Sequence, residues 1–326
     1  MKAIQLVDFK GVDSLAYVDV PTPKPAPGEV LIKVKAAGIN YAEVEQIQGK
    51  YLTFGKDLPF TMGFEIAGIV TEIGQNVLEI KIGDRVTAMA ISGGFAEYAT
   101  ASADALIPIP GNMSFADATT IPLQGMTAYT LLKYNVIPYM SESILIQAAA
   151  GGVGLYLVQL AKYFGIKKII ALSGSDDKLE LTKDLGAHFA INYTKPGWAS
   201  EVLKITDGKG VDVVLQMSVG EVGQESFKLI ANGGRIIVFG SKNYHDIITA
   251  EQIRQLIWQN QTLAGFAFPA LSPEKNRESL SEFLKIIKSN KIRIFANHPY
   301  SLTQAKEAFL ALQGRTTIGK VYFNIN

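Results

Sequence analysis

Alternating apolar and polar positions predict that the first hundred residues form a succession of short strands. In "EVLIKVKAAG" apolar side chains alternate with lysines from Val30 to Val34, which is the spacing of a strand with one buried face. The stretches "EIAGIVTEIG", "DRVTAMA" and "GFAEYAT" continue this pattern, and glycine-bearing turns such as Gly83-Asp84 separate them. This part of the chain is therefore expected to be a β domain.

The pattern changes from Ile144 onward, where apolar strands alternate with helical periods. The strand "SILIQA" precedes a helix with Val153, Leu157 and Leu160 on one face, and "KKIIALS" precedes a helix over residues 176–185. The segments "VDVVLQM", "EVGQESFKLI" and "GGRIIVFG" add a strand, a helix and a strand. Repeated strand–helix units of this kind predict a doubly wound parallel sheet.

The last sixty residues follow a third pattern. A helix is expected to begin at Ser272-Pro273. A further helix ends at Gly314, and "GKVYFNI" closes the chain as a strand. The apolar stripe of the first of these helices is predicted to comprise Leu280, Phe283, Leu284 and Ile287.

Composition narrows the class of protein. A chain of 326 residues with 48% hydrophobic residues is long enough for two domains, and a net charge of +1 offers no general attraction for nucleic acid or acidic membranes. The complete absence of cysteine excludes disulfides, thiolate nucleophiles and cysteine-containing zinc sites. No apolar run approaches the length needed to span a membrane, and charge interrupts the N-terminal stretch too early for a signal peptide. A cytoplasmic protein without membrane insertion is expected.

The stretch "QAAAGGVGLYLVQLAK" stands between a predicted strand and a predicted helix. Ala149, Gly151 and Gly154 have the spacing of the dinucleotide fingerprint G-x-G-x-x-G, with alanine in the first place. Gly151 would let the backbone approach a pyrophosphate, and Gly154 would let helix and strand pack closely. A tight turn of small residues is the alternative, but the strand and helix around it favour a phosphate site. The residues expected at the phosphates are Ala150, Gly151, Gly152, Val153 and Gly154.

The end of the second strand bears on which dinucleotide binds. An NAD enzyme usually carries an acidic side chain there, whereas this strand ends in "ALSGSDDK". Asp176 and Asp177 come later and suit the first turn of a helix. Lys178 either reaches a ribose phosphate or lies on a solvated helix face. The missing acid predicts NADP(H), and the residues expected at the ribose are Ser173, Gly174, Ser175 and Lys178.

Zinc-dependent alcohol dehydrogenases share this domain plan, but the zinc ligands are missing. His188, His245 and His298 are scattered and have no partner at ligand spacing, so each is expected to be a surface or hydrogen-bonded histidine. In "GFEIAG", Phe64 stands where the zinc enzymes have a ligating histidine. No metal site is expected.

From end to end the chain resembles the zinc-independent quinone oxidoreductases of the medium-chain dehydrogenase/reductase superfamily, which include the zeta-crystallin type. The resemblance runs through "AAGIN", "IQGKY", "GFEIAGIV", "GDRV", "PLQGMTAY", "AAAGGVGL", "LGAHFAINY", "GGRIIVFG" and "TTIGKVYF". It implies a GroES-like β-barrel domain of residues 1–122 and 265–326, with a Rossmann NADP(H)-binding domain of residues 123–264 inserted. It also implies NADPH as the cofactor and a homodimer or tetramer, of which the homodimer is expected.

The resemblance also implies roles for individual residues. Asn40 and Tyr51 look like polar groups that face the substrate. The residues that look like cofactor contacts are Thr127 at the nicotinamide, Lys178, Tyr193 and Arg315 at the ribose phosphate, and Phe239, Gly240 and Phe266 along the groove. The sequence departs from the family at Gln216, where relatives commonly carry an acid, and at Lys242 and His245, where smaller residues are more familiar.

Reaction chemistry favours a conjugated acceptor. Hydride transfer to a simple ketone gives a localised alkoxide that zinc or a proton relay must stabilise, whereas a quinone or enone gives a delocalised anion. One or two hydrogen bonds, here expected from Tyr51 and Asn40, suffice for that charge, although Tyr51 packing only its ring is the alternative. Four aromatic residues favour a small apolar quinone or enone as substrate, or else belong to the core: Tyr41, Phe54, Phe64 and Phe266.

Two other functions remain open from the sequence. "IQGKY" also resembles the stretch that carries the catalytic tyrosine in medium-chain enoyl reductases, which reduce enoyl thioesters of CoA or acyl-carrier protein. That function needs a basic landing patch, and the near-neutral charge shows no sign of one. A non-catalytic NADPH-binding or RNA-binding, crystallin-like protein is the second alternative, but no basic stretch with interleaved aromatics supports nucleic-acid binding.

Overall fold

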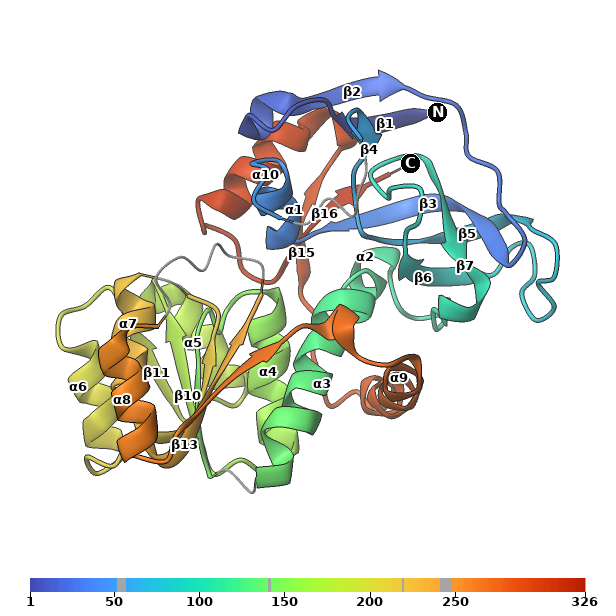
Figure 1. The fold of residues 1–326 in the computed structure, drawn as a ribbon. Coiled ribbons are helices and arrows are strands. Elements are labelled where there is room, and N and C mark those ends of the chain that lie inside the picture. Colours follow the sequence, from blue (N-terminus) through green and yellow to red (C-terminus); the bar gives the residue numbers. More distant parts are fainter. Residues whose placement is uncertain (52–56, 140–141, 219, 241–247, 326) are drawn as a thin grey trace. The chain divides into compact units, whose positions relative to one another are not determined.

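A computed structural model describes residues 1–51, 57–139, 142–218, 220–240 and 248–325. The chain divides into two compact units, one of residues 1–123 and 294–326 and the other of residues 124–293. Each unit has its own sheets, two in the first and one in the second (Figure 1). None of the described helices is long and apolar enough to cross a membrane.

The first unit is built on short strands, as the alternating pattern predicts, and they pair antiparallel except for β15 and β16, which are parallel. Its longest strand, β3, pairs with β5, β7 and β16, and the sheet runs in the order β15-β16-β3-β5-β6-β8. A second sheet has the order β2-β1-β4. The strands are β1 (Lys2–Leu6), β2 (Leu15–Asp19), β3 (Glu29–Ile39), β4 (Phe60–Thr61), β5 (Glu65–Ile73), β6 (Arg85–Met89), β7 (Tyr98–Ser102), β8 (Ile107–Pro108), β15 (Ala296–Tyr300) and β16 (Lys320–Asn324). The helices are α1 (Tyr41–Gln46), α2 (Phe115–Ala118) and α10 (Ala305–Gln313).

The core of the first unit joins the start of the chain to its end. Phe95 is fully buried, and its ring meets that of Phe323 edge-on with centroids 4.9 Å apart. The ring of Phe309, from α10, also meets that of Phe95 edge-on, with centroids 6.2 Å apart. This aromatic contact removes the three rings from water together and so favours the return of the C-terminal segment to the N-terminal strands.

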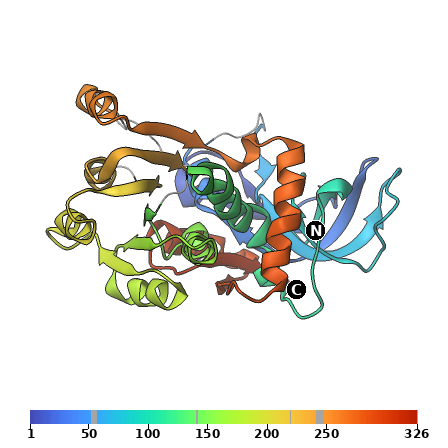
Figure 2. The ribbon, with the colours of Figure 1, turned by 90° about the horizontal axis from the view of Figure 1, so that it is seen from below.

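The second unit is the doubly wound parallel sheet that the strand–helix alternation predicts. Its six strands are parallel in the order β11-β10-β9-β12-β13-β14. Figures 1 and 2 show α6, α7 and α8 on one side of this sheet and α3 and α4 on the other. The strands are β9 (Ser143–Ile146), β10 (Lys168–Ser173), β11 (Phe189–Asn192), β12 (Val211–Gln216), β13 (Ile230–Phe239) and β14 (Thr262–Phe266). The helices are α3 (Met126–Asn135), α4 (Gly152–Tyr163), α5 (Asp176–Leu185), α6 (Trp198–Ile205), α7 (Glu221–Phe227), α8 (Ala250–Trp258) and α9 (Pro273–Lys288).

The boundary of this unit differs from the one expected from the sequence. Residues 265–293, which we assigned to the β domain, belong to the parallel-sheet unit. The strand β14 extends this sheet with Phe266 in register with Phe239, and α9 packs on α3, where the ring of Phe283 lies 5.5 Å from that of Tyr129. Tyr129 also donates a hydrogen bond to Glu282 at 2.5 Å. These contacts lie far apart in the sequence, which is why local pattern did not reveal them.

The helix α9 begins where predicted, but its buried stripe is displaced. Ser272 caps it, and its hydroxyl accepts a hydrogen bond from the N–H of Lys275 at 3.4 Å. The stripe was predicted to include Leu280 and Leu284, which are only half-buried. The side chains that the unit buries are Ser279, Phe283, Ile286 and Ile287. The face is set by the contact with α3, where Ser279 and the hydroxyl of Tyr134 lie 3.0 Å apart, and not by apolar content alone.

Candidate functional site

The glycine-rich turn links β9 to α4 at the carboxyl edge of the parallel sheet. Ala148 adopts the left-handed conformation with a φ of 50°, and the N–H of Gly151 closes the turn onto its carbonyl at 2.9 Å. Gly151 is the N-cap residue of α4, a helix of 12 residues. The first N–H groups of such a helix have no partner within the helix and carry the positive end of its dipole. The turn therefore has the chemistry of an anion site.

Two glycines of this turn have close neighbours, and only Gly154 is confined by backbone atoms. A Cβ on Gly154 would lie 2.7 Å from Cα of Ala149, so any side chain there would push α4 away from β9, as the sequence pattern implies. A Cβ on Gly152 would collide with the side-chain amide of Gln124, which packs over the start of α4. Sequence analysis did not single out Gln124, although it lies in the quoted motif "PLQGMTAY". Ala150 and Val153 lie in the same turn and in the first turn of α4.

The polar residues expected at the ribose gather where β10 ends. Ser173 is the last residue of β10, and Ser175 is the N-cap of α5. The hydroxyl of Tyr193 lies against Gly174, because a Cβ on that glycine would stand 2.9 Å from it. The N–H of Tyr193 donates to the carbonyl of Ser173 at 3.1 Å. The structure therefore brings Ser173, Gly174, Ser175 and Tyr193 together.

The two charged residues that follow have different surroundings. Asp176 opens α5 as predicted and is engaged by Lys195 at 2.7 Å and Asn192 at 3.1 Å, which together hold the pKa of its carboxyl below the usual range. Lys178 lies in the first turn of the same helix, and partial burial lowers the pKa of its ammonium. An exposed lysine on a solvated face would not be desolvated in this way.

The other expected cofactor residues come from several elements and from both units. Phe239 and Phe266 end neighbouring strands in register, and Gly240 follows with a φ of 99°. Thr127 is the second residue of α3. Arg315 belongs to the first unit, in the turn after α10. Lys242, His245 and Phe54 lie outside the described residues.

Gln147 orders the loop that follows β12, and Gln216 is the last residue of that strand. Gln216 ends β12 and is buried, and its Oε1 has no hydrogen-bond partner in the described part of the chain. Gln147, which directly precedes the glycine-rich turn, accepts hydrogen bonds from the N–H groups of Met217 at 3.0 Å and Ser218 at 2.7 Å. The sequence analysis missed Gln147. A polar residue at the end of an otherwise apolar strand was the available signal.

In the first unit, Asn40 belongs to a buried polar cluster. It stands between β3 and α1 and is 7% exposed. Its Nδ2 donates to Glu65 Oε1 at 2.9 Å, and its Oδ1 accepts from Lys320 Nζ at 2.7 Å. Lys320 also forms an ion pair with Glu65. Glu65 and Lys320 were missed by sequence analysis, although each is a charged residue at the start of an apolar strand, in "EIAGIV" and "KVYF".

Glu43 lies beside this cluster and close to Tyr51. It is fully buried and accepts hydrogen bonds from the N–H groups of Asn40 at 2.7 Å and Phe64 at 3.1 Å. Burial raises the pKa of the Glu43 carboxyl to about 8, although the charge of Lys320 opposes this. Burial, followed by the charge of Glu43, also raises the pKa of Tyr51. Tyr51 therefore keeps its proton at neutral pH and can donate a hydrogen bond.

The aromatic residues near Tyr51 are only partly buried. The rings of Tyr51 and Phe64 are tilted by 57° with centroids 6.1 Å apart. Tyr41, on α1, packs against the apolar core of the unit. Phe64 thus forms part of the surroundings of Tyr51.

Two of the three histidines accept hydrogen bonds from the backbone. His188 Nδ1 accepts from the N–H of Ile169 at 3.0 Å, and His298 Nε2 accepts from that of Ile318 at 3.1 Å. Among the described residues, no three side chains of histidine, cysteine, aspartate or glutamate are grouped so that they could hold a metal ion.

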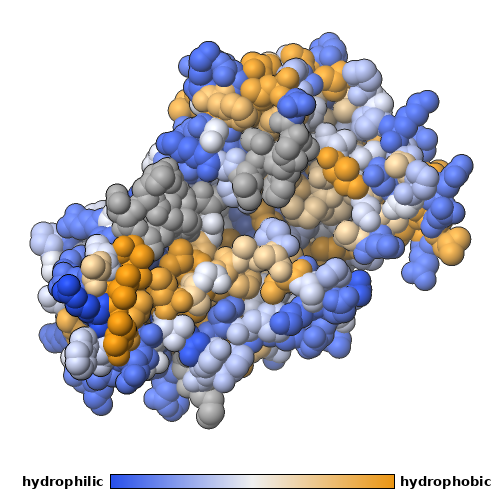
Figure 3. Space-filling view, in the orientation of Figure 1, coloured by the Kyte–Doolittle hydropathy of each residue, from blue (hydrophilic) through white to orange (hydrophobic). Residues whose placement is uncertain are grey.

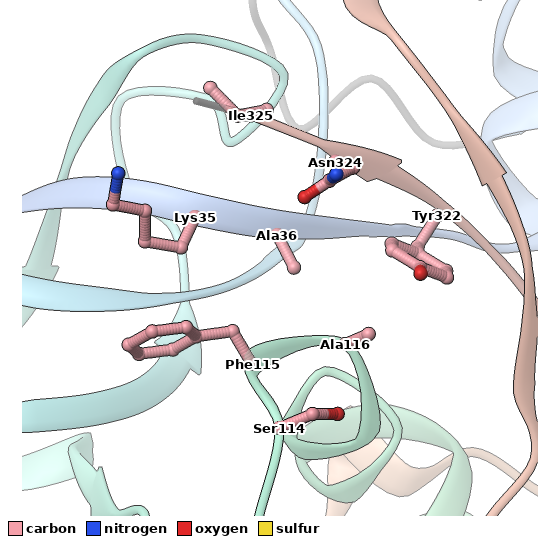
Figure 4. Close-up of a pocket in the computed structure, with 8 residues that line it drawn as sticks. All are labelled: Lys35, Ala36, Ser114, Phe115, Ala116, Tyr322, Asn324 and Ile325. Carbon is pink, nitrogen blue, oxygen red and sulfur yellow. The ribbon is translucent and has the colours of Figure 1, made fainter.

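A separate hollow lies between α2, β3 and β16 of the first unit (Figure 4). Its volume is about 320 Å³. None of the residues expected to bind cofactor or substrate lines it, so we assign it no part in the site. The lining residues are Lys35, Ala36, Ser114, Phe115, Ala116, Tyr322, Asn324 and Ile325.

Comparison with known proteins gives the family. Residues 26–111 match the alcohol dehydrogenase GroES-like domain, and residues 152–289 match the family described as zinc-binding dehydrogenase. The quinone oxidoreductase of Pseudomonas aeruginosa is 32% identical over 323 residues, which cover 98% of each chain.

Solved structures give the same result. The Escherichia coli quinone oxidoreductase complexed with NADPH has a TM-score of 0.89 and 28% identity, over 99% of this chain and 100% of that one. The Pseudomonas syringae quinone oxidoreductase has a TM-score of 0.89 and 29% identity, over 99% of each. The GroES-like domain and the Rossmann-type sheet expected from the sequence are thereby confirmed, and the chain belongs to the quinone oxidoreductase family of the medium-chain dehydrogenase/reductase superfamily.

Proposed function

We propose that the protein is an NADPH-dependent reductase that transfers a hydride to a quinone or a similar conjugated carbonyl without zinc. The observation that carries the proposal is the match, over nearly the whole chain, to quinone oxidoreductases, one of them complexed with NADPH. The absence of cysteine and the phenylalanine at position 64 support the zinc-independent part, because they remove ligands that a catalytic zinc would need.

The second unit offers a chemically suitable site for NADPH. The turn before α4 would hold the pyrophosphate through Gly151 and Gly152, while the close packing at Gly154 fixes the position of the helix. Ser173, Ser175 and Tyr193 would donate hydrogen bonds to the phosphorylated ribose, and Lys178 would supply positive charge. Bound NADPH supplies the hydride.

The first unit would stabilise the charge that forms on the acceptor. Hydride addition to a quinone leaves a phenolate, and a proton then completes the hydroquinone. Tyr51 and the Nδ2 of Asn40 would each donate a hydrogen bond to the acceptor oxygen. The raised pKa of Tyr51 means that its hydroxyl is protonated and available to donate, and the proton comes from Tyr51 or from solvent.

Turnover of the Tyr51→Phe variant tests this assignment. With saturating NADPH and a small ortho-quinone, we expect kcat to fall about tenfold or more, because one of two donors to the developing anion is lost. Tyr17→Phe is the matched control, since Tyr17 is an exposed tyrosine of the same unit. An unchanged kcat in Tyr51→Phe would remove Tyr51 from the mechanism. The resemblance of "IQGKY" to enoyl reductases makes a 2-enoyl-CoA the second acceptor to assay.

Nucleotide binding tests the cofactor assignment separately. We expect Lys178→Ala to raise the Kd for NADPH several-fold while leaving the Kd for NADH unchanged, because only NADPH carries the ribose phosphate. Lys183→Ala, an exposed lysine on the same helix, is the control. Equal weakening for both nucleotides would place Lys178 away from the phosphate.

We further propose that the protein acts as a homodimer in the cytoplasm. The strand β14 lies at the edge of the parallel sheet, where it can pair with another chain. Beside it, α8 exposes Ile253, Ile257 and Trp258, of which Trp258 is 84% exposed, and Figure 3 shows apolar residues gathered over this helix. Burial of this face against a second copy would remove it from water. Analytical sedimentation tests this. A dimer for the natural chain and a monomer for Trp258→Glu would support the proposal, and the same state for both would contradict the role of this face.

A further inference from the structure

The proposed role of Asn40 depends on which end of its amide faces the substrate, and the buried cluster determines that. A lysine ammonium can only donate hydrogen bonds, and an ionised carboxylate can only accept them. Lys320 Nζ lies 2.7 Å from one end of the Asn40 amide, and Glu65 Oε1 lies 2.9 Å from the other. The oxygen must therefore face Lys320 and the nitrogen must face Glu65, because the reversed amide would place donor against donor and acceptor against acceptor.

The strand register brings these groups together and leaves room for them. Gly38 of β3 lies opposite Glu65 of β5 and opposite Tyr322 of β16. A Cβ on Gly38 would stand 2.6 Å from Glu65 Oε1 and would collide with Cε of Lys320. Glu65 and Lys320 are 0% exposed, so neither could move into solvent to avoid it. The glycine is therefore needed for the pair to occupy this place.

Stability alone is a poor explanation for the pair. Taking two charges out of water costs about as much as their attraction returns, unless further hydrogen bonds satisfy them. Glu65 Oε2 is buried and has no hydrogen-bond partner within the described ranges. A pair kept only for stability would be expected to use this oxygen as well. The pair instead makes its hydrogen bonds to the two ends of the Asn40 amide.

We propose that Lys320 and Glu65 are positioning residues that hold the Asn40 amide with its nitrogen fixed as the donor for the acceptor oxygen. Because the amide group is planar, an N–H bond that points at Glu65 also fixes the direction of the second N–H bond of Nδ2. This inference rests on the proposed function, in which Asn40 donates to the acceptor.

A double-mutant cycle tests the inference. The pair is replaced by Lys320→Met with Glu65→Gln, which removes both charges together so that neither is left buried alone. The change is made in the natural chain and in Asn40→Ala, and kcat with an ortho-quinone and the Kd for NADPH are measured for all four proteins. We expect kcat to fall about tenfold in the natural chain and less than twofold in Asn40→Ala, because no amide remains there to be oriented. The Kd for NADPH is expected to stay within twofold.

The possible failures differ from one another. An equal loss of kcat in both backgrounds would show that the pair acts through the shape or stability of the unit, and would overturn the inference. An unchanged kcat in the natural chain would also overturn it. If Asn40→Ala alone leaves kcat unchanged, the proposed role of Asn40 itself is wrong.

A second variant covers the case in which the double replacement does not fold. Gly38→Ala displaces the pair without changing any of its charges, and Gly111→Ala, where an added Cβ meets nothing within 4 Å, is its control. We expect Gly38→Ala to lower kcat in the natural chain but not further in Asn40→Ala. Loss in both backgrounds would again contradict the positioning role.

Discussion

The glycine-rich turn before α4 and the buried cluster around Asn40 are two ways of building a functional site. The turn is made by neighbouring residues, and its working groups are backbone N–H groups at a helix end. The cluster joins three strands, and its Lys320 and Asn40 stand 280 positions apart in the chain. The first kind of site can be identified from a short motif, whereas the second exists only once the strands have paired.

The largest expected effect comes from breaking the buried cluster at one charge. Lys320→Met leaves Glu65 ionised and unpaired in the core, so we expect the free energy of unfolding to fall by about 3–5 kcal/mol. Denaturation in urea measures this. Lys306→Met is the control, because its ion pair with Asp13 is exposed and worth about 0–1 kcal/mol. Equal losses in the two variants would contradict the buried character of the cluster.

The corresponding change in the turn is steric. Gly154→Ala places a Cβ 2.7 Å from Cα of Ala149, and α4 must shift to admit it. We expect a loss of about 1–3 kcal/mol in unfolding free energy and at least a tenfold rise in the Kd for NADPH, because the N–H groups move with the helix. Gly265→Ala, with no atom within 4 Å of its Cβ, should change neither. If Gly154→Ala binds NADPH as tightly as the natural chain, the turn is not the phosphate site.

These two regions show which features of the fold and of the site could be predicted from the sequence. The strand over Val30 to Val34, the start of α9 at Ser272 and the helix beginning at Asp176 were predicted and confirmed, since each depends on local spacing or capping. The single buried face expected of that strand was wrong, because β3 buries residues 30–32 and 36–39 in succession. The assignment of residues 265–293 and the partners of Asn40 depended on contacts between distant segments. Both Glu65 and Lys320 lie inside quoted motifs, but only strand pairing shows that they meet.

A smaller effect concerns the proton on Glu43. Its folded pKa of about 8 lies above its ordinary value of 4.5, so between these pH values the folded protein holds a proton that the unfolded chain has released. The free energy of unfolding should therefore be greatest below this window and fall by up to about 1.4 kcal/mol for each pH unit as the pH rises through it. Urea denaturation from pH 5 to pH 8 should show this fall in the natural chain and a weaker fall in Glu43→Gln. The measured quantity is the stability of the fold and not the activity. The exposed Glu72, changed to Gln, should leave the fall intact, and a fall that persists in Glu43→Gln would assign it to other groups.

The smallest effect tests the backbone of the turn. Ala148 has a φ of 50°, a conformation that costs a residue with a Cβ about 1–2 kcal/mol. Ala148→Gly relieves this strain but adds freedom to the unfolded chain, so we expect a net change between zero and about 1 kcal/mol of stabilisation. Thermal unfolding measures it. A destabilisation larger than 1 kcal/mol would mean that the methyl group of Ala148 is needed for packing.

The most direct test of the proposed function is the oxidation of NADPH followed by absorbance, with a small ortho-quinone and a 2-enoyl-CoA as alternative acceptors and NADH in parallel. We expect the quinone to be reduced faster than the thioester, and NADPH to be used in preference to NADH. Faster reduction of the enoyl thioester, or no turnover of either acceptor despite tight binding of NADPH, would contradict the proposal that this chain is a quinone reductase.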